Sequence, residues 1–301
     1  MIVTREIALE RVVARVGSER VDNASLARPE TLAATGFPVR RAVPAGTSLF
    51  DFALPVARAC LDGIDPAAVR GVIVATFSHE MRFPALAVRL ASALGLNAAT
   101  PAFDVQLACS AYPYAVYLAG RLAADANGKV LVVDGDIQSR LTAASEPATR
   151  LVLGDAVTAT LVTAGASEAT SPFAFLSDYG EALTCPAEGP VAMEGFKVFS
   201  FVATRVTALV REVASAGARP DLFVPHGANA YMVRQLAKAV GLEDRLLVAS
   251  GEAANTGSSS VPLALAQGGR PGRVLIAGFG AGLSAAAGTV RLADDFTGRE
   301  I

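Results

Sequence analysis

The sequence predicts an α/β protein made of two related halves, and three observations lead to this prediction. The chain has 301 residues, of which 52% are hydrophobic, enough to bury a large core. Short apolar runs of β-forming residues alternate with helical stretches rich in Ala and Leu along nearly the whole chain, which is typical of a mainly parallel sheet with crossover helices. The order of these elements also repeats within the chain.

The repeat is clearest in a strand and the helix that follows it. An apolar strand that runs into a small polar loop occurs at residues 71–78 and again at 221–229. Each is followed by a helix that ends at a glycine, Gly95 in the first case and Gly241 in the second. Glycine readily adopts the left-handed conformation that ends a helix, so the two segments are expected to have the same local structure.

A further pair of strands, at 129–136 and 273–282, extends the repeat. We therefore divide the chain into halves 1–168 and 169–301, with the chemistry at equivalent strand ends. The segment 171–201 has no counterpart in the first half and carries Gly, Pro and aromatic residues. We expect this inserted segment to line a substrate tunnel.

Composition and charge exclude several classes of protein. The formal net charge is −2 and the charges form no runs, which argues against a nucleic-acid partner. No apolar run approaches the roughly 20 residues that cross a bilayer, and the N-terminus lacks the pattern of a signal peptide, so we expect a cytoplasmic protein with no membrane partner. The three cysteines are widely spaced, without the pairing of a metal site or a disulfide framework, and we expect no metal and no cofactor.

Cys109 is the candidate nucleophile. It lies where a strand turns into an apolar helix, so its thiol is expected at the positive N-terminal end of that helix, a position that favours the thiolate. A cysteine taken alone is more often a small buried residue. The residues elsewhere in the chain therefore have to decide between the two interpretations.

His226 and Asn255 are the candidate partners of Cys109. The chain has two histidines, and His226 follows an apolar strand and precedes small residues that let a substrate approach, whereas His79 lies in a charged loop. Asn255 occupies the position in the second half that Cys109 occupies in the first, so the internal symmetry would bring both side chains to one cavity. Alone, its Asn-Thr-Gly segment is typical of a turn.

Four segments together resemble the ketoacyl-ACP synthase III family of condensing enzymes. They are ACSA around Cys109, PHGAN around His226, ANTGSSSVPLAL around Asn255, and GFGAGLS at 278–284, whose small residues leave backbone amides open to an oxyanion. Their order and spacing match across the chain. Further matches begin at Thr35, Pro101, Leu153, Ser177 and Met193. The resemblance covers roughly residues 30–292.

The resemblance implies a thiolase-like fold, in which two pseudo-symmetric halves form five layers in the order αβαβα. It implies a homodimer, with a heterodimer of two homologues as the other possibility. Cys109, His226 and Asn255 would form the catalytic triad at the base of a tunnel as wide as a pantetheine chain. The backbone N–H groups of Cys109 and Ala281 would form the oxyanion hole.

Substrate-binding residues also follow from the resemblance. Phe83 would cross the dimer interface and cap the partner's acyl pocket, to which Phe199 and Phe279 would also contribute. The cluster of phenylalanines in the inserted segment favours an apolar acyl chain. Arg234 and Lys238 lie at i and i+4 on one helix, where they could contact the acidic face of a carrier protein or stay solvated.

Three departures from the family concern coenzyme A. The chain contains no tryptophan, although the familiar enzymes use one to hold the nucleotide. Two basic positions of the family are Ala34 and Glu252 here, which argues against a coenzyme A nucleotide site. A glutamine of the family is Gly227. These changes are typical of a specialised relative.

In the mechanism that the resemblance implies, Cys109 takes an acyl group from an acyl carrier protein or from acyl-CoA. A malonyl or β-ketoacyl unit on a carrier protein then enters. Asn255 and a neutral His226, donating through Nε2, hold its thioester oxygen while the carbon nucleophile forms and attacks the acyl-cysteine. Two alternatives stay open at this point: acyl transfer to a hydroxyl or amine, and a non-catalytic partner subunit of a condensing enzyme.

Overall fold

The computed structural model describes residues 1–143, 146–165, 169–187 and 189–301, and its α/β class is the predicted one. The strands are β1 (Ile2–Arg5), β2 (Ile7–Val16), β3 (Glu19–Asp22), β4 (Val39–Ala42), β5 (Val69–Ala75), β6 (Ala102–Val105), β7 (Lys129–Asp136), β8 (Ala156–Ala164), β9 (Thr170–Ser177), β10 (Leu183–Thr184), β11 (Ala192–Met193), β12 (Leu222–Pro225), β13 (Gly272–Gly280) and β14 (Ser284–Glu300). The helices are α1 (Pro29–Thr35), α2 (Leu49–Cys60), α3 (Leu86–Ala93), α4 (Ala111–Ala126), α5 (Pro147–Val152), α6 (Gly195–Phe201), α7 (Thr207–Ala214), α8 (Ala230–Val240) and α9 (Ser260–Gly268).

Ten strands form one continuous hydrogen-bonded sheet. The order along it is β1-β9-β14-β2-β8-β7-β5-β6, and β13 and β12 extend from β14. The expected mainly parallel arrangement is wrong, because β7–β8, β8–β2, β13–β14, β14–β9 and β1–β9 are antiparallel pairs. β13 and β14 are joined by a short loop rather than by a crossover helix, and a short connection forces the second strand to run back along the first.

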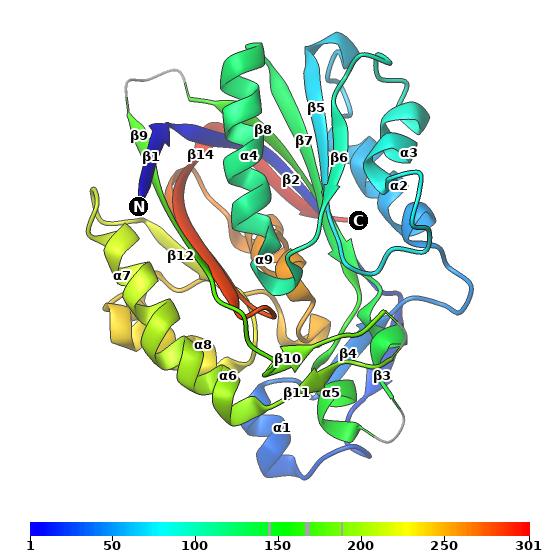
Figure 1. Cartoon of the computed structure of the whole chain (residues 1–301), viewed down its shortest axis with the longest axis vertical. Coiled ribbons are helices and arrows are strands. Elements are labelled where there is room, and N and C mark those ends of the chain that lie inside the picture. The colour runs from blue at the N-terminus through cyan, green and yellow to red at the C-terminus, as the bar shows by residue number, and fades with distance from the viewer. Residues whose placement is uncertain (144–145, 166–168, 188) are drawn as a thin grey trace.

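The five-layer arrangement is present (Figure 1). Helices α2 and α3 cover one face of strands β2 and β5–β8. Helices α4 and α9 fill the middle, where each contacts strands of both halves, and α7 packs on the far side of β9 and β14 with α8 beside it. The continuous sheet thus forms two layers, with α4 and α9 between them and the other helices outside. Because helices cover both faces of each layer, most strands are nearly continuous apolar runs.

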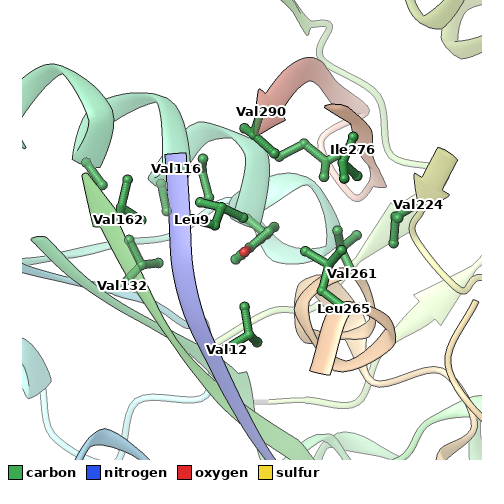
Figure 2. Packing of buried hydrophobic residues seen from close by; sticks show 14 of the residues in the cluster. Leu9, Val12, Val116, Val132, Val162, Val224, Val261, Leu265, Ile276 and Val290 are labelled. Carbon is green, nitrogen blue, oxygen red and sulfur yellow. The ribbon is translucent and has the colours of Figure 1, made fainter. Parts of the chain in front are cut away.

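The central layer has the largest buried core cluster, shown close up in Figure 2. On α9, Val261 and Leu265 are completely buried, and on α4 so is Val116. They pack between Leu9 of one sheet layer and Ile276 of the other. Burying one such side chain stabilises the fold by roughly 1.5–3 kcal/mol, so α4 and α9 are held firmly, and with them the loops at their N-termini.

The predicted repeat is largely confirmed. Strand β5 leads to α3 and strand β12 leads to α8, and Gly95 and Gly241 both have the left-handed backbone expected at these helix ends. Strands β7 and β13 are the further expected pair. Cys109 follows strand β6, whereas among the described residues the segment before Asn255 forms no strand and makes only isolated bridges, from Leu246 to Phe223 and from Asn255 to Leu153.

The two halves exchange strands. β1, at the start of the chain, pairs with β9, and the last part of β14 pairs with β2. The expected boundary at residue 168 falls among residues 166–168, outside the described part of the chain. Within the described residues, no helix is both long and apolar enough to cross a membrane.

Candidate active site

Cys109 lies in the single turn η2 (Ala108–Ser110) between β6 and the first residue of α4. The turn begins with Ala108 at φ +42°, a conformation that a residue with a Cβ adopts only with strain. Ser110 stabilises the turn, because its hydroxyl donates a hydrogen bond of 2.8 Å to the carbonyl of Leu107. The nucleophile candidate is therefore held at the N-terminus of a central helix, as predicted.

Two glycines of β13 make room for this turn. A Cβ on Gly280 would lie 2.8 Å from the Cβ of Cys109 and 3.2 Å from its Sγ, and a Cβ on Gly278 would lie 2.9 Å from the Cys109 carbonyl oxygen. Contacts this short do not occur between real side chains and backbone. The glycine-rich segment thus lets β13 approach the nucleophile, and Ala281 follows directly at the mouth of the cavity.

Two opposing effects act on the Cys109 thiol. Burial raises its pKa to about 12, and the carboxyl groups of Asp136 and Asp134 add to the rise. The helix N-terminus acts in the opposite direction and is typically worth about 0.3–2 kcal/mol. Burial therefore opposes the predicted thiolate, and the charge of this thiol stays a prediction.

His226 follows β12 directly, and only 2% of its surface is exposed. Its Nδ1 atom lies 2.9 Å from the hydroxyl oxygen of Ser260, and the edge of its ring packs on Phe279 at 5.3 Å between centroids. Burial lowers the pKa of His226 to about 4, although a hydrogen bond to the Gly257 carbonyl opposes part of the effect. The imidazole is neutral at physiological pH.

Asn255 is fixed through its backbone and its side chain. Its N–H donates to the carbonyl of Val152 at 2.8 Å, and its own carbonyl accepts from Gly154 at 3.0 Å. The side-chain Oδ1 accepts a 2.9 Å hydrogen bond from the N–H of Gly257, and Nδ2 lies 3.5 Å from the Ala228 carbonyl. Because Oδ1 is occupied in this way, the amide presents its N–H donors on the other side.

Contacts between these loops bring the three candidate residues to one place. Cys109 lies against Gly280, and the neighbouring Phe279 packs on the ring of His226. Asn255 reaches the loop just after His226 through its Nδ2 atom. The turn with Cys109 and the 3-10 turn η7 (Gly257–Ser259), which follows Asn255, also lie side by side at the ends of α4 and α9.

A cavity of about 890 Å³ opens at this point. Cys109, Asn255 and Ala281 line it, and His226 is not among its lining residues. As predicted, residues of the inserted segment form one wall. They are Ser177, Asp178, Tyr179, Leu183, Thr184, Cys185, Pro186, Ala187, Val191 and Met193. The volume suits a long, flexible ligand.

Two of the phenylalanines expected in the acyl pocket lie elsewhere. Phe199 stacks on the ring of Tyr231 at 6.1 Å and is partly buried against a neighbouring core cluster, and Phe279 is buried beneath His226 on the opposite side of β13. Neither lines the cavity. Phe83 is 81% exposed, and its expected place in the partner's pocket stays a prediction. The apolar lining of the cavity consists of Phe77 and Tyr179 together with aliphatic residues such as Leu107, Ile137, Leu141, Leu153 and Leu283.

Other predicted residues are on the surface. Arg234 and Lys238 are exposed on α8, and Glu252 forms an ion pair with Arg41 at 2.8 Å. His79, the histidine not chosen, pairs with Asp104 at 3.2 Å and lines the far end of the cavity. Among the described residues, no group of three His, Cys, Asp or Glu could hold a metal ion.

Sequence reasoning missed Ser260, although it touches the imidazole. The run of three serines after Asn255 could have indicated such a role, because hydroxyl side chains at the start of a helix commonly bind neighbouring backbone groups. It also missed Gln138, whose Nε2 donates to the carbonyls of Gly154 and Asn255 at 2.9 and 3.1 Å and so holds the asparagine loop.

Comparisons with known proteins agree with this geometry. Residues 103–178 match the family model for 3-oxoacyl-[acyl-carrier-protein (ACP)] synthase III, and residues 216–292 match the model of its C-terminal part. The chain is 32% identical to a beta-ketoacyl-[acyl-carrier-protein] synthase III of Lactobacillus delbrueckii subsp. bulgaricus, over 86% of this chain and 88% of that protein. This chain belongs to the 3-oxoacyl-ACP synthase III family.

A further relative and two solved structures are also similar to this chain. The chain is 33% identical to synthase III 2 of Streptomyces coelicolor over 83% of this chain and 81% of that protein. Its fold matches a 3-oxoacyl-(acyl-carrier protein) synthase of Burkholderia xenovorans with a TM-score of 0.92, 26% identity, and coverage of 100% and 98%. It also matches the priming β-ketosynthase of the R1128 polyketide pathway, with a TM-score of 0.87, 26% identity, and coverage of 97% for both chains.

Membership of the synthase III family decides among the functional classes left open by the sequence. It confirms an acyltransferase of the condensing type and the thiolase-like fold. Neither acyl transfer to a hydroxyl or amine nor a purely structural subunit is needed to explain the chain. The roles of individual residues rest on the geometry described above.

Replacing Gly280 by alanine should slow acylation of Cys109 by about 10- to 100-fold, because the new Cβ would displace the nucleophile. The rate is measured by intact-mass spectrometry after rapid mixing with an acyl thioester. Gly195→Ala is the matched control, since a Cβ there meets nothing within 4 Å. Equal rates for Gly280→Ala and the unmodified protein would contradict the packing argument.

The rate at which iodoacetamide alkylates Cys109 should rise about tenfold per pH unit between pH 7 and pH 10, without a plateau. A thiol with a pKa near 12 gains thiolate over this whole range. Alkylation is followed by mass spectrometry of the Cys109 peptide in a Cys185→Ser background, since Cys185 is exposed. A plateau below pH 8 would mean that the thiol is ionised in the resting protein.

Proposed function

We propose that this protein condenses an acyl group with a malonyl or β-ketoacyl unit, and that Cys109 carries the acyl group between the two steps. The observation that carries the proposal is the shared cavity at the ends of α4 and α9. Cys109 and Asn255 both line it, and the ring of His226 packs on Phe279, the residue before the Gly280 that contacts Cys109. Two half-reactions on one carbonyl carbon need this juxtaposition of a nucleophile and hydrogen-bond donors.

In the first half-reaction, Cys109 Sγ attacks the carbonyl carbon of an acyl thioester. A carbon–sulfur bond forms, and the carbonyl oxygen takes the electron pair in an oxyanion that the N–H groups of Cys109 and Ala281 hold. When the oxyanion collapses, the bond to the donor thiol breaks. The proton of the Cys109 thiol ends on the leaving sulfur, and the acyl-enzyme remains.

In the second half-reaction, the thioester of the incoming unit lies near Asn255. The Nδ2–H group donates to its thioester oxygen, because Gly257 holds Oδ1 on the opposite side. Loss of carbon dioxide, or of a proton, from the carbon beside the thioester leaves an enolate that this hydrogen bond stabilises. The enolate carbon attacks the acyl-cysteine, a carbon–carbon bond forms, and the Cys109 thiolate leaves and is protonated.

We propose a carrier protein rather than coenzyme A as the main donor. Glu252 stands at a position that is basic in the family resemblance, and it forms an ion pair with Arg41, so the two side chains together offer no net positive charge. A coenzyme A nucleotide is strongly anionic and would gain no electrostatic attraction there. Arg234 and Lys238 on α8 offer exposed positive charges to an acidic carrier domain.

The acylation reaction tests the function. Incubation with acyl-carrier, acyl-CoA and short N-acetylcysteamine thioesters should add the mass of the acyl group to the protein, and Cys109→Ala should show no addition. Arg234→Glu should lower the rate with the carrier donor several-fold and leave the rate with the small donor unchanged. No addition from any donor would rule out the acyl-enzyme. A faster reaction with acyl-CoA than with the carrier would overturn the donor preference.

We also propose a homodimer formed through the edge of the sheet at β6. This edge has no partner strand among the described residues, and exposed apolar side chains surround it. They are Met81, Phe83, Val88 and Phe103. An unpaired strand edge flanked by apolar residues is a ready site for pairing with a second copy.

Sedimentation equilibrium at micromolar concentration should give twice the chain mass, and Phe103→Glu should shift the protein toward the monomer, because Phe103 lies on β6. Val248→Glu is the matched control, since Val248 is similarly exposed but lies on the segment beside β12. A monomer for the unmodified protein would contradict the proposed interface.

A further inference from the structure

The hydroxyl of Ser260 lies at the centre of three hydrogen bonds beside His226. It donates to the carbonyl oxygen of Gly257 at 2.7 Å and accepts from the N–H of Gly227 at 3.0 Å. Its third neighbour is Nδ1 of His226 at 2.9 Å. Ser260 is 2% exposed, so these groups have no alternative partner in bulk water.

The single proton of this hydroxyl decides the protonation of the imidazole. A carbonyl oxygen can only accept a hydrogen bond, so the Ser260 proton has to lie between Oγ and the Gly257 oxygen. If it pointed to Nδ1 instead, two acceptor oxygens would face each other at 2.7 Å without a proton between them. The contact with His226 then needs its proton from the ring, and Nδ1 carries it.

A further hydrogen bond agrees with a proton on Nδ1. The N–H of Gly227 donates to Ser260 Oγ, so one lone pair of that oxygen is already used. The remaining lone pair is free to accept the Nδ1 proton.

We infer that Ser260 is a positioning residue that holds neutral His226 in the tautomer with the proton on Nδ1, so that Nε2 is a free base for the Cys109 thiol. This inference rests on the proposed acylation of Cys109. The resemblance implied that Nε2 of His226 donates a hydrogen bond during condensation, whereas the tautomer inferred here belongs to the resting protein. In the resting protein the imidazole accepts rather than donates at Nε2.

The proton balance of the acylation step then follows. As Cys109 Sγ bonds to the carbonyl carbon, its proton passes to Nε2 and His226 becomes an imidazolium. When the tetrahedral oxyanion collapses and the bond to the donor thiol breaks, Nε2 returns the proton to the leaving sulfur. His226 is again neutral with its proton on Nδ1, and no oxidant or further reactant is needed.

A serine differs here from a backbone group. A backbone carbonyl at Nδ1 would require a proton there, and a backbone N–H would forbid one. A hydroxyl allows either, and in this structure its hydrogen bond to Gly257 selects the proton on Nδ1.

Nuclear magnetic resonance reads the tautomer directly. The chain has only two histidines, so selective ¹⁵N-histidine labelling gives two ring systems, and His79→Gln assigns them. In the unmodified protein at pH 7, we expect the Nδ1 signal of His226 at the upfield position of a protonated nitrogen and the Nε2 signal at the downfield position of a bare one. The reverse pattern would overturn the inference, whatever the activity.

Ser260→Ala tests the consequence for catalysis. The acylation rate constant of Cys109 should fall at least tenfold, whereas the donor concentration giving half the maximal rate should change less than twofold, because Ser260 does not line the cavity. Ser260→Thr keeps the hydroxyl and should restore most of the rate. An unchanged acylation rate in Ser260→Ala would overturn the role of Ser260. Absence of acylation in the unmodified protein would instead refute the proposed function, and the spectrum would still report the tautomer.

Discussion

Cys109, the candidate nucleophile, can occupy its position only because β13 presents no side chain to it. Gly278 and Gly280 let the Cys109 turn lie against the strand at distances that any Cβ would fill. This contact joins elements that follow different sheet layers, since the turn comes after β6 and the loop of His226 follows β12, the neighbour of β13. The two central helices then supply rigid supports, with Cys109 before α4 and Asn255 before α9.

Burial favours the uncharged forms of the two titratable groups at the centre of the candidate site. The Cys109 thiol has a raised pKa and the His226 imidazole a lowered one, and in both cases burial is the largest cause. The nearby carboxyl groups of Asp134 and Asp136 are buried as well, and burial raises their pKa values. Burial thus disfavours a resting ion pair between Cys109 and His226.

Much of this arrangement could be predicted from local patterns. The repeated order of strand, loop and helix was enough to relate Asn255 to Cys109, because each precedes a central helix. His226 could be chosen over His79 because small residues follow it in the sequence. Local patterns failed where partners are distant in the chain. The direction of β14 is set by β2, β9 and β13. Phe199 and Phe279 do not line the cavity, because their neighbours in the fold turn them away from it. Ser260 could not be predicted because its contact is with the imidazole of His226, 34 residues away in the chain.

The length and place of β14 have a consequence for how the chain folds. Its 17 residues contact β9 and β13 in one layer and β2 in the other, so this one strand closes the middle of the sheet. Until residues 284–300 have paired with them, β2 and β9 each have an open edge, and such edges pair readily with those of other chains. A folding intermediate without β14 in place is therefore the species of this protein most exposed to aggregation.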